Sequence, residues 1–177
     1  MVPSSTPRLR RAQPEDAQGI AQAHIESWQA AYRELMPPEV VASHSVQSRT
    51  AQWLQWLEDP GQKSIWVVEH DHEIQGFVAG GPTRGKWIEY CPGEIYALYL
   101  RPACFGQGLG AQLFRHMQAD LVAQGFASQW VWVLTDNAPA RRFYEKMGGV
   151  YQTDTVIEIG HPPQSFAEVA YGFGPLL

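Results

Sequence analysis

The stretch that decides the fold covers residues Glu94–Leu113 and reads EIYALYLRPACFGQGLGAQL. After the leading glutamate its first residues are apolar, which is typical of a central strand that is covered on both faces. An Arg-Pro pair ends this strand, and the glycines Gly106, Gly108 and Gly110 follow. From Leu109 onward apolar residues recur at helical spacing. The segment therefore predicts a strand, a glycine-rich turn and a helix in direct succession.

The glycine-rich turn is a candidate anion site. Glycines let the backbone approach a ligand closely, and the first N–H groups of the following helix lie unpaired at the positive end of its dipole. Phosphate or pyrophosphate suits such a place. The spacing alone leaves alternatives open, because it matches neither a Walker A loop nor the dinucleotide fingerprint, and a turn that only packs against a neighbour reads the same way.

The rest of the chain supplies the other layers of one α/β domain over residues 1–177, with 1–7 as a loose tail. The order β-α-α-β-β-β-α-β-α-β-β predicts a mixed sheet of about seven strands with helices on both faces, and residues 94–134 predict a parallel pair with a right-handed crossover. The expected elements are a strand at Leu9, helices at 14–35 and 38–58, a hairpin of strands 64–70 and 74–79, a loop at 80–93, a strand at 129–134, a helix after Asn137, and strands near 150–159 and 167–173.

Composition excludes several classes of protein. With 45% hydrophobic and 18% charged residues among 177, the chain is expected to fold as a globular protein. A net charge of -5 argues against nucleic-acid binding, which needs a basic footprint. We expect no membrane helix and no signal peptide, and hence a cytoplasmic protein. The two cysteines, Cys91 and Cys104, and the six histidines lack ligand spacing, so we expect no metal.

The segment 94–113 resembles the central motif of the GNAT superfamily of N-acetyltransferases. In that family a central strand leads into a Q/R-x-x-G-x-G/A loop, which binds the pyrophosphate of coenzyme A. Gly108 and Gly110 match this loop, whereas Phe105 stands in place of Gln or Arg. Residues 137–148, NAPARRFYEKMG, are similar to the second landmark of the family, N-x-x-A-x-x-F-Y-x-K-x-G. The resemblance covers nearly the whole chain, and it implies acetyl-CoA as the co-substrate and a splayed central parallel pair.

The resemblance also implies where the cofactor lies. The backbone of the central strand would pair with the pantetheine amides as if the cofactor were an added strand, and the turn and helix start would hold the pyrophosphate. From the residues alone Asn137 is a helix N-cap, and the resemblance adds a contact to the pantetheine arm. The expected CoA contacts are Leu98, Tyr99, Leu100, Phe105, Gly106, Gln107, Gly108, Leu109, Gly110, Ala111, Asn137 and Tyr144.

Two residues are candidates for the chemistry. The resemblance places Tyr144 near the CoA sulfur, where a phenol with a pKa of about 10 can protonate the leaving thiolate; the alternative is a core aromatic. Glu94 is the candidate general base, directly or through a water, because a carboxylate ahead of an apolar run is partly desolvated and its pKa is raised. Its alternative is a solvated strand end.

Three aromatic residues are candidates for the acceptor pocket. Trp28 and Tyr32 lie at helical spacing, which equally fits plain core packing. Tyr96 should share one face of its strand with Glu94. We expect the acceptor to be the primary amine of a small molecule, attacked directly in a ternary complex. A CoA-binding sensor without catalysis and an enzyme acting on protein lysines or N-termini are the alternatives, and a homodimer through the final hairpin is compatible with the pattern.

Overall fold

The structure is a computed structural model that describes residues 6–175, so most of the expected loose tail lies outside the described residues. Seven strands form one mixed sheet in the order β1-β2-β3-β4-β5-β7-β6. The strands are β1 (Arg8–Arg11), β2 (Ser64–His70), β3 (Glu73–Pro82), β4 (Gly93–Leu100), β5 (Gln129–Leu134), β6 (Val150–Ile159) and β7 (Gln164–Phe173). The helices are α1 (Ala17–Tyr32), α2 (Pro38–Val41), α3 (Val46–Glu58), α4 (Leu109–Ala123) and α5 (Ala138–Lys146), with short 3-10 turns at Pro14–Asp16, Gly85–Glu89 and Pro102–Cys104.

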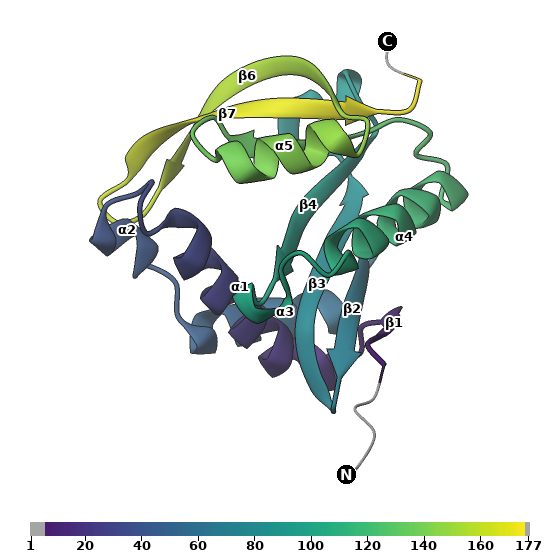
Figure 1. Ribbon diagram of the computed structural model, residues 1–177. Coiled ribbons are helices and arrows are strands. Elements are labelled where there is room, and N and C mark those ends of the chain that lie inside the picture. Colours follow the sequence, from purple (N-terminus) through teal and green to yellow (C-terminus); the bar gives the residue numbers. More distant parts are fainter. Residues whose placement is uncertain (1–5, 176–177) are drawn as a thin grey trace.

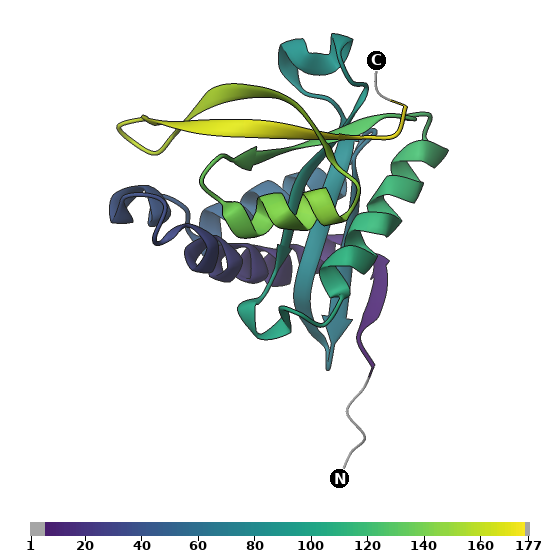
Figure 2. The same ribbon diagram turned by 45° about the horizontal axis from the view of Figure 1, so that its top comes forward.

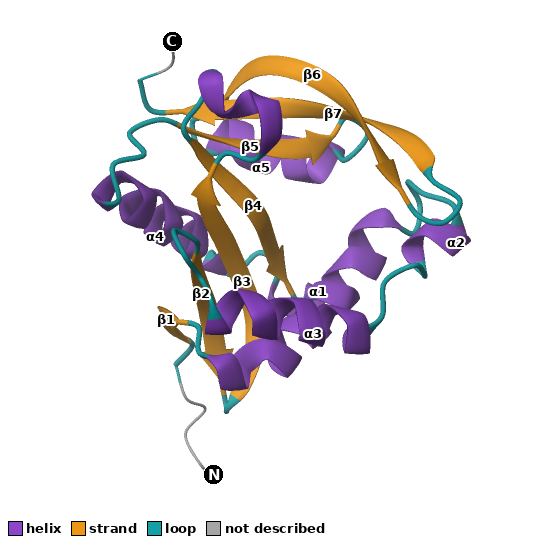
Figure 3. Cartoon of the chain, turned by 180° about the vertical axis from the view of Figure 1, so that it is seen from behind, coloured by secondary structure: helices purple, strands orange, loops and turns teal. Residues whose placement is uncertain are grey.

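Helices cover both faces of the sheet, as the sequence predicts. Side chains alternate between the two faces of a strand, so Val67 and Phe77 pack against α1 and α3. Val78 and Ile95 point the other way and pack against α4. Figure 1 shows α4 across the front of β2–β4 and α5 beneath β6 and β7, and Figure 3 shows α1 and α3 on the opposite face.

The central parallel pair separates after three residue pairs. The pairing of β4 with β5 ends at Ile95 and Val131. On the other side of β4, consecutive residues of β3 pair with Ile95 and Ala97, which leaves Tyr96 as an extra residue. Such a β-bulge bends the strand that carries it. The bulge therefore turns β4 away from β5 directly after their last pair, and the expected splay is confirmed.

Some boundaries differ from the sequence-based expectation. The helix expected over 38–58 is two helices, because Ser45 begins α3 as an N-cap whose side chain accepts the Ser48 N–H. The helix expected to reach residue 35 ends at Tyr32. The loop expected at 80–93 starts only after Pro82: β3 continues through Gly80, where a side chain would meet Met117 of α4 at 2.9 Å. Glycine is tolerated in a strand where another group comes this close.

Within residues 6–175 no helix combines the length and the apolar character needed to cross a membrane.

Candidate active site

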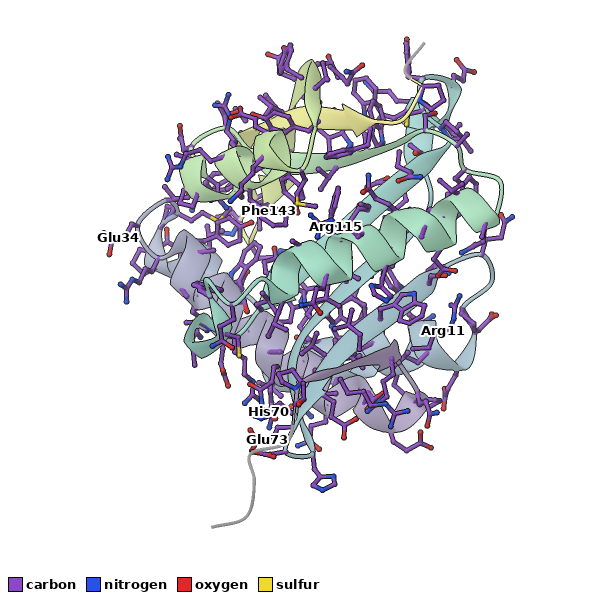
Figure 4. The ribbon with its side chains drawn as sticks, turned by 45° about the vertical axis from the view of Figure 1, so that its right-hand side comes forward. Arg11, Glu34, His70, Glu73, Arg115 and Phe143 are labelled. Atoms are coloured by element: carbon purple, nitrogen blue, oxygen red, sulfur yellow. The ribbon has the colours of Figure 1, made fainter. Side chains whose placement is uncertain are left out.

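A cavity of about 910 Å³ opens where β4 and β5 separate. Residues of α1, β4, the glycine turn, α4, β5 and α5 line it. Figure 4 labels Arg115 of α4 and Phe143 of α5 beside the gap between these helices. All expected CoA contacts except Gln107 meet in this one cavity: Leu98, Tyr99, Leu100, Phe105, Gly106, Gly108, Leu109, Gly110, Ala111, Asn137 and Tyr144.

The glycine turn presents unpaired backbone donors at the start of α4. Gly106 and Gly108 have φ of 76° and 79°, a left-handed conformation that favours glycine. Among the described residues, no acceptor binds the N–H groups of residues 106–111, as expected for the first turn of a helix. A Cβ built on Gly106 or Gly108 meets nothing within 4 Å. The turn is therefore an open cradle of N–H groups at the positive end of a helix dipole.

Side chains around the cradle are cationic or apolar. Arg115 lines the cavity and adds a positive charge beside the cradle. Phe105 also lines it, and 58% of its surface is exposed. Gln107 turns its side chain back to the loop, where its Nε2 donates to the Ala103 carbonyl at 3.0 Å. Gln107 would therefore contact a ligand in the cradle through its backbone N–H.

The edge of β4 that faces the cavity has no strand partner beyond Ile95. Its backbone groups are available to an added strand-like ligand, although the Leu100 carbonyl already accepts a hydrogen bond from Ser27 Oγ. Across the cavity Asn137 caps α5, as the sequence predicts: its Oδ1 accepts the Ala140 N–H at 3.2 Å.

Three tyrosines meet in the middle of the cavity. The Tyr32 and Tyr99 hydroxyl oxygens lie 3.4 Å apart. Burial raises the pKa of Tyr32, Tyr99 and Tyr144 above the usual range of a phenol, so all three keep their protons at neutral pH. Tyr144 is only 6% exposed, and its hydroxyl bonds to no other side chain or carbonyl in residues 6–175. That hydroxyl is free to donate to a group in the cavity.

Glu94 is buried, and Arg84 holds it in an ion pair. Its carboxylate accepts the Arg84 backbone N–H at 2.9 Å and the Arg84 Nε at 3.1 Å, and it also binds Nη2. The Arg84 guanidinium lies over the Tyr96 ring, 4.5 Å from its centre. Glu94 and Tyr96 thus share one face, as expected, but only Tyr96 lines the cavity.

The expected acceptor residues divide into two groups. Tyr32 and Tyr96 line the cavity. The Tyr96 hydroxyl donates to the Pro82 carbonyl at 2.5 Å, and burial raises its pKa to about 12. Trp28 lies in a core cluster outside the cavity lining, where its indole N–H donates to the Val41 carbonyl at 3.1 Å.

Two further residues at the cavity carry groups that could take part in chemistry, Glu34 and Cys104. Glu34 is at the cavity rim, but its side chain is 84% exposed and points outward in Figure 4. Cys104 lines the cavity, and burial raises the pKa of its thiol, which weakens it as a nucleophile. Among the described residues no three His, Cys, Asp or Glu side chains gather closely enough to hold a metal ion.

Glu168 is a charged residue near the site that the sequence reasoning missed. It lies on β7 opposite Leu134 of β5. Burial, reinforced by the negative charge of Glu94 and opposed by Arg84, raises the pKa of Glu168 to about 7. The signal in the sequence was its position as a lone charge inside the strand expected at 167–173.

Comparisons with known proteins agree with this geometry. Residues 25–149 match the family described as Acetyltransferase (GNAT) family. The uncharacterized N-acetyltransferase YuaI of Bacillus subtilis is 31% identical over 138 residues, which cover 77% of this chain and 76% of YuaI. The mycothiol acetyltransferase of Streptomyces avermitilis is 32% identical over 100 residues, which cover 56% of this chain and 30% of that protein.

A solved structure shares the fold over nearly its full length. The PaiA N-acetyltransferase of Thermoplasma acidophilum, determined in complex with coenzyme A, matches with a TM-score of 0.76. The match covers 96% of this chain and 99% of that one at 18% identity. Family match, relatives and fold together establish that this chain belongs to the GNAT family and is an acyl-CoA-dependent acetyltransferase.

Proposed function

We propose that this enzyme transfers an acetyl group from acetyl-CoA to the primary amine of a small molecule, by direct attack in a ternary complex. The observation that carries the proposal is the single cavity between β4 and β5. Its lining includes both the cradle of unpaired N–H groups and Tyr144, whose hydroxyl has no partner among residues 6–175.

The residues present fit coenzyme A. The N–H groups of residues 106–111, with Arg115 beside them, suit a pyrophosphate. The unpaired edge of β4 at Leu98, Tyr99 and Leu100 suits the pantetheine amides. The open space at Gly106 and Gly108 lets a ligand reach the backbone. The similar fold of the PaiA N-acetyltransferase, which was determined in complex with coenzyme A, supports the assignment of this cavity to CoA.

Tyr144 is the proposed acid of the reaction. When the amine attacks the thioester carbonyl, a C–N bond forms, and the C–S bond breaks as the intermediate collapses. The departing thiolate needs a proton, and a buried phenol without a partner in the fold is placed to donate one. Glu94 is the candidate general base for the amine from the sequence analysis. Because Glu94 lies outside the cavity lining, a proton would reach it only through an intervening group.

The shape of the cavity supports a small acceptor. The aromatic residues Tyr32, Tyr96 and Trp132 are among those that line it. Aromatic walls with a small number of polar groups are typical of small-molecule pockets. The partial similarity to a mycothiol acetyltransferase is compatible with such an acceptor. A protein acceptor and a catalytically silent CoA-binding module are the competing outcomes.

Thiol release from acetyl-CoA tests the proposal. Separate reactions contain the purified protein, acetyl-CoA and one amine, taken from polyamines, amino acids, aminoglycosides or basic peptides. CoA binding is measured in parallel by calorimetry. We expect release with one class of small amine and a slower release by Tyr144→Phe. Release with peptides alone would favour the protein acceptor. CoA binding without release on the whole panel would favour the silent module, and absence of CoA binding would refute the cofactor assignment.

A further inference from the structure

We infer that Glu168 is the base that takes the proton of the acceptor ammonium through an intervening water, and that Glu94 with Arg84 forms a fixed ion pair beside it. This inference deepens the proposed function and rests on it. Four observations carry it: the place of Glu168 in the sheet, its lack of partners, the charges around it and the closure of the proton balance.

The strand register places Glu168 on the acceptor side of the sheet. Glu168 pairs with Leu134 of β5, and directly opposite residues of an antiparallel pair share one face. Leu134 packs in the cluster that contains Trp28 and Tyr32 of α1, so the Glu168 side chain faces the same way. Leu134 lies beyond Val131, the last residue of β5 that pairs with β4. Glu168 is therefore one strand away from the gap between β4 and β5, on the face of the sheet that α1 covers. Figure 2 shows the β6–β7 hairpin reaching across toward α2.

The Glu168 carboxyl has no partner in the described part of the chain, although it is half-buried. Its oxygens are not among the side-chain atoms that are fully buried without a partner, so they remain accessible. Glu94 is the opposite case, since Arg84 supplies it with three hydrogen bonds. Neither carboxyl group lines the cavity, but of the two only Glu168 has no partner among residues 6–175, so it can bind a water that carries a proton from the cavity.

The surrounding charges favour a cationic acceptor. The titratable groups that face Glu168 are Tyr32 of α1, Glu94 of β4, and Arg84 between β3 and β4. Tyr32 keeps its proton, so two carboxyl groups share one guanidinium. An ammonium ion entering beside them restores neutrality. The pKa of Glu168, raised to about 7, lies in the range that suits a general base at neutral pH.

The proton balance closes with these residues. Glu168 takes one proton from the ammonium and leaves a neutral amine. The amine nitrogen attacks the thioester carbonyl, the C–N bond forms and the C–S bond breaks. The thiolate receives one proton from Tyr144, and the second N–H proton that nitrogen loses in this step replaces it on Tyr144. Glu168 finally releases its proton to water, so the products are the amide, the free thiol and one proton.

The pH dependence of kcat/KM tests the inference, with acetyl-CoA and whichever alkylamine of the panel releases thiol. We expect an acidic limb in the wild-type enzyme, with kcat/KM falling as the pH drops below about 7. Glu168→Gln should lose that limb and at least about 100-fold of kcat/KM at pH 7, while its Kd for CoA stays within about twofold. Glu158→Gln, an exposed change on the adjacent β6, is the matched control and should behave as wild type.

The outcomes separate the two proposals. If the wild type is active and Glu168→Gln keeps the limb, or Glu94→Gln alone removes it, the inference is overturned while the proposed function stands. If the wild type binds CoA but releases no thiol with any amine, the proposed function and the inference fail together. Glu168→Asp is the second variant, for use if Glu168→Gln folds poorly. It keeps a carboxyl group, so it should retain the limb at reduced kcat.

Discussion

Replacing Glu168 with Gln should make the stability of the fold less dependent on pH. The folded protein raises the pKa of this carboxyl from 4.5 to about 7, mainly by burial. Below about pH 4.5 the group is protonated in both states and adds no cost to folding. Between pH 4.5 and 7 the unfolded chain releases the proton and the folded one keeps it, so stability falls as the pH rises. Above 7 the full cost is present, and the Gln variant avoids it.

The size of the effect follows from the shift in pKa. A change from 4.5 to about 7 corresponds to about 3 kcal/mol of free energy. Because the side chain is only half-buried, water screens part of this cost, and we expect about 1–2 kcal/mol.

Urea unfolding at pH 5 and pH 8 measures the effect. The stability of Glu168→Gln relative to wild type should rise by about 1–2 kcal/mol from pH 5 to pH 8. Glu158→Gln should show no such rise, because its side chain is exposed on β6. An equal difference between Glu168→Gln and wild type at both pH values would refute the argument that burial holds a proton on Glu168.

Three other predictions concern the cavity and its ion pair. Tyr144→Phe should lower kcat about 10- to 100-fold yet change the free energy of unfolding by less than about 1 kcal/mol, because the hydroxyl has no partner in the fold; a large loss of stability would contradict this. Arg84→Ala should cost about 2–4 kcal/mol in urea unfolding, since it leaves the Glu94 carboxylate buried without its ion-pair partner and with only a backbone N–H donor. Adding Glu94→Gln should recover part of this loss, and an additive effect of the two changes would contradict the ion pair. Gly108→Val should weaken CoA binding at least about tenfold in calorimetry, because a side chain there enters the open cradle at a φ of 79°; an unchanged Kd would argue against the cradle.

Local patterns in the sequence were enough to predict the elements that form the proposed CoA-binding side of the site. The strand, glycine turn and helix of residues 94–113 are contiguous, so their relative placement follows from short-range geometry. The cap at Asn137 is likewise decided within three residues, by its bond to Ala140. These elements can be predicted without knowledge of tertiary contacts. The resemblance to the GNAT family then indicated that they bind coenzyme A together.

The acceptor side depends on contacts between distant segments. Arg84 reaches Glu94 only because the chain returns after β3, in a segment whose sequence indicates just a loop. Trp28 and Tyr32 lie one turn apart on α1, yet one packs in the core and the other lines the cavity. Helical spacing cannot separate these two positions, since both belong to one apolar face.

The bulge at Tyr96 links the two sides of the site. One extra residue in β4 ends its pairing with β5 after Ile95, and this leaves the edge of β4 open to a strand-like cofactor. The same departure leaves Leu134 paired with Glu168 of β7 but with no residue of β4. A single insertion in one strand thus accounts for the open edge of β4 where we propose that the thioester binds.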